Sequence, residues 1–131
     1  MLTDQIALAM KAFSGYDPNA DGEPTIASLR YLAFEDPSEV IPLESRVGIV
    51  LVHPDLADPG PAGSIDLLPL LQRLKRDMRG DGLQTRFIRA QVYAGTRHQD
   101  GRTLLALRKF LQLVRASYDR LEGVLLIGDF P

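Results

Sequence analysis

The sequence predicts an α/β fold of three layers, with a short parallel sheet between helices. Three apolar segments suited to β-strands, at residues 46–53, 83–93 and 123–128, alternate with two long amphipathic segments suited to helices, at 65–79 and 102–120. The first and last strands contain unbroken aliphatic runs, VGIVLV and VLLI, which are typical of strands buried on both faces of a parallel sheet. Because β-α-β crossovers are right-handed, the βαβαβ order also defines how helices cover the sheet.

The expected order of the three strands across the sheet is second, first, third (2-1-3). The 46–53 and 123–128 strands are the most apolar, so we expect them to be neighbours in the middle. Arg86 and Arg89 interrupt the 83–93 strand, and charges of this kind favour an edge position because they discourage further pairing. In this order the direction in which successive strands are added to the sheet reverses after the second strand. The reversal predicts that the two long helices lie on opposite faces of the sheet. It also predicts a topological switch point between the first and third strands.

The amino-terminal third of the chain has a different pattern. Residues 3–13 predict a short helix with Thr3 or Asp4 as its cap, and residues 25–34 predict a second short helix. Prolines then indicate a loop. We therefore expect a segment of short helices and turns at 1–45, followed by the βαβαβ unit at 46–131.

A short stretch, DPNADG, matches the first half of a calcium-binding loop. Asp17, Asn19 and Asp21 supply oxygens at loop positions 1, 3 and 5, and Gly22 permits the sharp turn at position 6. The stretch resembles an EF-hand or dockerin loop, but position 12 is Ser28, where a carboxylate normally completes the coordination shell. A calcium site and a plain Asx turn are both open interpretations, and calcium is the one cofactor that the sequence suggests.

Three polar residues lie at or just beyond the carboxyl ends of two strands that we expect to be neighbours. They are His53, Asp55 and Asp129, and ligands bind at this edge of open α/β sheets. A functional site would be an acid–base pair or an incomplete metal site. The alternative is that these side chains cap strand ends and hold loops by hydrogen bonds. No phosphate-binding glycine loop and no G-x-S-x-G motif is present, so neither nucleotide binding nor serine hydrolysis is indicated.

The composition excludes several classes of protein. The 131 residues are 45% apolar and 24% charged, which suits a chain that buries a core. The net charge of −2 gives no electrostatic basis for binding nucleic acid or an anionic membrane. No apolar run is long enough for a transmembrane helix, and the N-terminus does not read as a signal peptide. The compartment stays open, because Met1 is also compatible with a start inside a longer secreted protein. The absence of Cys excludes disulfides and a Cys nucleophile within these residues.

Four segments after residue 45 carry a resemblance to a known family. They are the strand VGIVLV, the helix LLPLLQRLKRDM followed by GDGLQTRFI, the helix LLALRKFLQLVR, and the closing LEGVLLIGDFP. With these segments, residues 46–131 resemble the first half of a caspase-like domain of the gingipain type, the C25 peptidases. The resemblance implies a caspase-like fold and a parent cysteine peptidase whose catalytic His and Cys follow later strands. Neither His53 nor His98 stands at the family's His position, so it implies no catalytic residue in this chain.

These patterns support three hypotheses for the function. The first is an amino-terminal fragment of a gingipain-like cysteine peptidase or peptidase-like protein, in which the exposed edge of the 123–128 strand pairs with the remainder of the parent. The second is a non-enzymatic caspase-like or flavodoxin-like interaction module, in which residues 1–45 or a partner chain such as a second copy cover that edge. The third is a calcium-dependent adaptor that acts through Asp17, Asn19 and Asp21.

Overall fold

A computed structural model gives the fold of most of the chain. It describes residues 3–14, 16, 28–58, 66–91, 101–128 and 130. For residues 101–103 it describes the backbone and not the side chains. The elements in chain order are α1 (Gln5–Ser14), β1 (Ser28–Tyr31), β2 (Val47–Val52), α2 (Pro54–Ala57), α3 (Leu68–Gly80), β3 (Gln84–Gln91), α4 (Gly101–Ser117) and β4 (Leu121–Ile127).

The sheet has four strands in the order β1-β3-β2-β4. β2 pairs in parallel with β3 on one side and with β4 on the other, whereas β1 pairs antiparallel with β3. The α/β class expected from the sequence is confirmed. The short, purely parallel sheet of order 2-1-3 is wrong, because a fourth strand extends the sheet and makes it mixed.

The added strand, β1, comes from the segment for which the sequence predicts a helix at 25–34. That prediction is wrong for Ser28–Tyr31, which pair with residues 88–91 of β3. A helix this short gains little from its own propensity, so the unpaired edge of β3 decides the conformation. β3, which Arg86 and Arg89 led us to expect at the edge, therefore lies inside the sheet.

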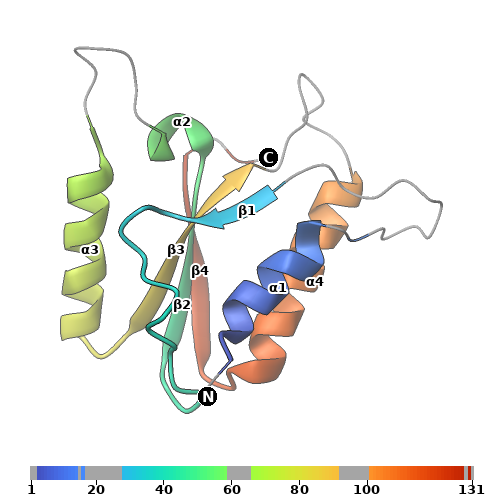
Figure 1. Cartoon of the computed structure of the whole chain (residues 1–131), viewed down its shortest axis with the longest axis horizontal. Coiled ribbons are helices and arrows are strands. Elements are labelled where there is room, and N and C mark those ends of the chain that lie inside the picture. Colours follow the sequence, from blue (N-terminus) through green and yellow to red (C-terminus); the bar gives the residue numbers. More distant parts are fainter. Residues whose placement is uncertain are drawn as a thin grey trace.

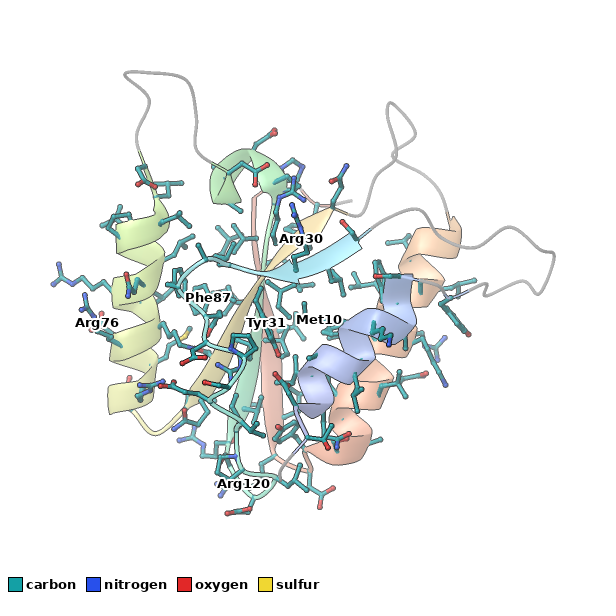
Figure 2. The ribbon with its side chains drawn as sticks, viewed as in Figure 1. Met10, Arg30, Tyr31, Arg76, Phe87 and Arg120 are labelled. Atoms are coloured by element: carbon teal, nitrogen blue, oxygen red, sulfur yellow. The ribbon has the colours of Figure 1, made fainter. Side chains whose placement is uncertain are left out.

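Helices cover both faces of the sheet (Figure 1). α3 lies on one face, and α1 packs with α4 on the other, so the two long helices lie on opposite faces as expected. In Figure 2 the side chain of Phe87 lies on the α3 side, and those of Met10 and Tyr31 lie on the α1 side. The larger core is the one between the sheet, α1 and α4.

α1 is an integral part of that larger core. It begins at the predicted cap Asp4, whose Oδ1 accepts the backbone N–H groups of Ile6 and Ala7, both at 3.0 Å. Its buried residues follow the helical period and form one apolar stripe: Ile6, Ala9, Met10 and Phe13. The described part of segment 1–45 therefore shares its core with the sheet.

β2 and β4 carry similar aliphatic runs but differ in burial. All six residues of β2 are buried, as the sequence predicts for a strand with neighbours on both sides and helices on both faces. The same prediction is wrong for β4, whose residues are exposed from Glu122 to Leu126. β4 has one strand neighbour, β2, so it lies at the edge of the sheet and not in the middle, and its edge is exposed as the first hypothesis expects.

Candidate functional site

The uncovered surface of β4 is the main candidate for a functional site. The exposed fractions of Val124, Leu125 and Leu126 are 38%, 43% and 50%. Figure 1 shows β4 beside β2, and the strand order places β4 at the edge of the sheet opposite β1. The described residues of segment 1–45 do not cover this edge, because β1 pairs with β3 on the opposite side of the sheet. The hypothesis that segment 1–45 covers it is wrong for those residues.

Both faces of β4 are open. Residues that pair in register in parallel strands direct their side chains to the same face. Val124 pairs with Ile49, so it lies on the α1/α4 face, and Leu126 follows on the same face. Leu125 pairs with Val50, so it lies on the α3 face. A partner that covered only one face would leave the other in water.

The free edge of β4 presents backbone groups at alternate residues. The Ile127 carbonyl accepts the N–H of His53 at 2.9 Å, so Ile127 directs its backbone groups toward β2. Alternation along the strand then directs the N–H and C=O groups of Val124 and Leu126 away from β2. These two residues are the ones that an incoming strand would pair with.

A charged residue stands only at the start of β4. Glu122 is an extra residue in the pairing with β2, where Val47 is opposite Leu121 and Gly48 is opposite Gly123. The Nε of Arg46 donates to Oε1 of Glu122 at 2.8 Å, and this guanidinium holds the pKa of the carboxyl below its usual range. The stretch from 123 to 127 contains no charge and no proline, which are the residues that normally protect an edge strand.

An apolar hollow lies beside β4 on the α3 face. Its volume is about 300 Å³, and Met78, Leu83 and Leu125 form part of its wall. Gly48 and Gly123, which are opposite each other in the β2/β4 pair, line it and contribute no side chain. A Cβ atom added at Gly123 would meet no atom within 4 Å. The hollow is therefore suited to an apolar side chain from a partner.

His53 and Asp55 lie together at the carboxyl end of β2. His53 caps α2, because its Nδ1 accepts the backbone N–H of Asp55 at 3.1 Å. The Asp55 carboxylate is 3.7 Å from the same nitrogen, but a nitrogen that accepts a hydrogen bond carries no proton, so this contact is not a salt bridge in this arrangement. The imidazole packs edge-on against Phe130, with ring centroids 6.0 Å apart. Asp129 lies outside the described residues, so the three-residue site stays a prediction.

The candidate calcium ligands Asp17, Asn19 and Asp21 also lie outside the described residues. Within the part of the chain that the structure describes, no group of three His, Cys, Asp or Glu residues could hold a metal ion. The calcium site stays a prediction, which titration calorimetry with calcium would test. None of the helices in the described ranges combines the length and apolar character needed to cross a membrane.

The sequence analysis missed a buried charged cluster on the far side of the sheet from β4. It consists of Glu35 from the loop after β1, Lys75 from α3 and Arg86 from β3. The signal was present, because an Arg inside an otherwise apolar strand requires a buried partner if that strand is not at an edge. The partner is 51 residues away in sequence, so no local pattern identifies it.

Comparison of the chain with protein-family models, with curated proteins and with solved structures finds no match.

Proposed function

We propose that this chain is the amino-terminal α/β part of a gingipain-like, caspase-like protein, in which the sheet continues past β4. The observation that supports this proposal is the exposed, uncharged stretch 123–127 of β4 at the edge of the sheet. In this proposal the chain has a structural role: it supplies half of a sheet and no catalytic residue. The resemblance of residues 46–131 to C25 peptidases indicates what continues it.

A further β-strand followed by a helix would match the open surface of β4. The strand would pair with the outward backbone groups of Val124 and Leu126. The helix would cover one of the two open faces of β4, in the way that α3 lies on one face of the sheet and α1 with α4 on the other. Burying the exposed parts of Val124, Leu125 and Leu126 would contribute on the order of 1 kcal/mol each before the costs of association.

The gene beyond the codon for Pro131 tests this proposal. We expect an open reading frame that encodes an apolar strand, then a His-Gly pair after a strand, and a Cys after a later strand. A stop codon directly after Pro131 would overturn it. Peptidase activity of the 131-residue chain alone would also contradict it, because the chain has no Cys to act as the nucleophile.

The second candidate function is a non-enzymatic interaction module in which two copies pair through β4. A specific register favours it. A two-fold axis beside Leu125 places Val124 of each copy opposite Leu126 of the other, and these are the residues whose backbone groups point outward. The same register sets Glu122 opposite Gly128, so no like charges meet.

Solution mass by light scattering tests self-pairing. We expect a dimer for the native chain and a monomer for Leu126→Lys, because a charge at the edge opposes strand addition. Leu126→Pro should also give a monomer without unfolding, since the Leu126 N–H points away from β2 and proline is tolerated at such positions. The matched control is Leu70→Lys on α3, which replaces a leucine that is 58% exposed elsewhere and should remain a dimer.

Hydrogen exchange gives an independent measurement. In a monomer the amide of Ile127 should be protected by β2, whereas the amides of Val124 and Leu126 should exchange rapidly. A native chain that is a monomer at all concentrations would remove the second candidate. A monomer in which the amides of Val124 and Leu126 are as strongly protected as that of Ile127 would contradict both candidates.

A further inference from the structure

A second cavity lies at the half of β3 that β1 leaves unpaired. β1 reaches only residues 88–91, so the first half of β3 has no strand on that side. The cavity has a volume of about 340 Å³ between the last turns of α3, the start of β3 and residues 39–42. We call it the Arg86 cavity. Its lining shares only Thr85 with that of the hollow beside β4.

A buried carboxylate takes the place of the missing strand. Oε2 of Glu35 accepts the backbone N–H of Phe87 at 2.6 Å, and the Glu35 side chain is fully buried. The Nζ of Lys75 lies 2.7 Å from Oε1 of Glu35. The NH1 group of Arg86 donates a hydrogen bond to the same oxygen, with 3.2 Å between the nitrogen and the oxygen. Lys75 also donates to the Thr85 carbonyl at 2.5 Å. This network fixes both cations at the wall of the cavity.

The positive charge around the cavity exceeds the negative charge. Lys75 and Arg86 share the single carboxylate of Glu35, and the guanidinium of Arg79 adds a third cation to the lining. The one acidic residue in the lining is Glu39, which is exposed and whose backbone carbonyl accepts from Arg86. Burial lowers the pKa of Lys75, and the nearby charges of Arg86 and Arg79 lower it further against the opposing effect of Glu35. An anion would relieve this repulsion.

Two buried donors in the lining have no hydrogen-bond partner among the described residues. They are Nε of Arg86 and Oγ1 of Thr85, which belong to residues only 2% and 3% exposed. Unpaired buried donors are rare because each costs about 1–3 kcal/mol. Both residues line the same cavity, so one ligand with several acceptor oxygens could satisfy both.

We propose that the Arg86 cavity binds a small oxyanion, a phosphate or carboxylate group. Arg86 and Thr85 donate to its oxygens, and Lys75 and Arg79 balance its charge. Glu35 holds Lys75 and Arg86 in place and does not contact the ligand. The site is separate from β4, so it does not depend on the function proposed above.

NMR titration of the full chain tests the site, with the Arg86 Nε–H resonance as the reporter. Inorganic phosphate and acetate are added separately at constant ionic strength. We expect saturable shifts of that resonance with one or both anions. Saturation with phosphate alone identifies a phosphate-type ligand, and saturation with acetate alone identifies a carboxylate. The absence of saturation with both overturns the proposal.

Two variants distinguish a specific site from general attraction of anions. Arg79→Gln should weaken binding about tenfold or more, because it removes a charged hydrogen-bond donor. Arg73→Gln removes the same charge from α3 outside the cavity lining and should leave binding unchanged. Equal weakening by both variants would contradict the proposal.

Thr85→Val gives a second, independent readout. It keeps the shape of the side chain and removes the unpaired hydroxyl, so the free protein should become more stable while anion binding weakens. A more stable protein with unchanged anion affinity would show that the hydroxyl has no role in binding, and would overturn the assignment of Thr85.

Discussion

Glu35 is the residue on which the buried charged cluster depends. Replacement by Gln keeps the shape of the side chain but leaves Lys75 and Arg86 without a negative partner. We expect Glu35→Gln to lower the free energy of unfolding by about 3–5 kcal/mol, measured by urea denaturation at neutral pH. Glu39→Gln is the control, because Glu39 is exposed, and it should change stability by less than about 0.5 kcal/mol. Equal effects of the two variants would contradict a structural role for the cluster.

Tyr31 links stability to alkaline pH. Its hydroxyl donates to Oδ2 of Asp4 at 2.8 Å, and burial, then this hydrogen bond, raise its pKa above the usual 10.0. Above pH 10 the unfolded chain loses this proton while the folded chain keeps it, so the free energy of unfolding should fall as pH rises. Below pH 10 the contribution is fully present. Burial raises the pKa of Tyr118 too, so Tyr31→Phe should reduce the fall without abolishing it. An unchanged slope in Tyr31→Phe would refute the link.

Single residues also show where sequence reasoning reaches its limit. The sequence narrowed the cap of the first helix to Thr3 or Asp4, because capping depends on neighbours in the sequence, and the structure shows that Asp4 is the cap. Arg86 and Arg89 were interpreted as residues that protect an edge, but Arg86 is buried beside Glu35 and Arg89 forms a bidentate pair with Asp58 at 2.6 and 2.9 Å. Both partners are distant in sequence, so only the folded chain reveals them.

At the scale of elements, two glycines at β4 should respond to substitution in opposite ways. A Cβ at Gly123 meets open space, so Gly123→Val should stabilise the strand by about 0.5–1 kcal/mol and fill part of the apolar hollow. Gly128 has φ +115, and a Cβ there would lie 2.4 Å from Cβ of His53. Gly128→Ala should therefore destabilise the protein by more than about 1 kcal/mol. Thermal unfolding of both variants checks this, and a stabilising Gly128→Ala would show that the turn after β4 is not as described.

The two aliphatic strands explain why elements were easier to predict than their burial. The runs in β2 and β4 predicted strands at 46–53 and 123–128. The bounds of both strands in the structure differ from these predicted bounds by at most two residues. Burial depends on what lies beside a strand, and this is not encoded in its own residues. β2 has neighbours on both sides, whereas β4 has one. The sequence was sufficient to predict that the edge of β4 is exposed. It was not sufficient to predict that both faces of β4 are open or that an apolar hollow lies beside the strand.

At the scale of the whole molecule, α1 should be essential for folding. Phe13 is only 1% exposed and lies in the core between α1, α4 and the sheet. We expect Phe13→Ala to cost about 3–5 kcal/mol in the free energy of unfolding, from lost burial and the cavity left behind. Leu8→Ala on the same helix is the matched control, because Leu8 is 50% exposed and its truncation should have little effect. If both variants unfolded at the same urea concentration, α1 would not be part of the cooperative unit.

The two edges of the sheet are unequal, and this limits how copies of the chain can assemble. β1 has four residues and exposes Arg30 near its middle, whereas β4 presents an uncharged run after Glu122. Charge at an edge opposes the addition of another strand. Two copies that joined through β4 would leave only their β1 edges at the ends of the combined sheet. Growth would then stop after one step, so the fold allows a closed pair and opposes the open-ended fibres that two adhesive edges would produce.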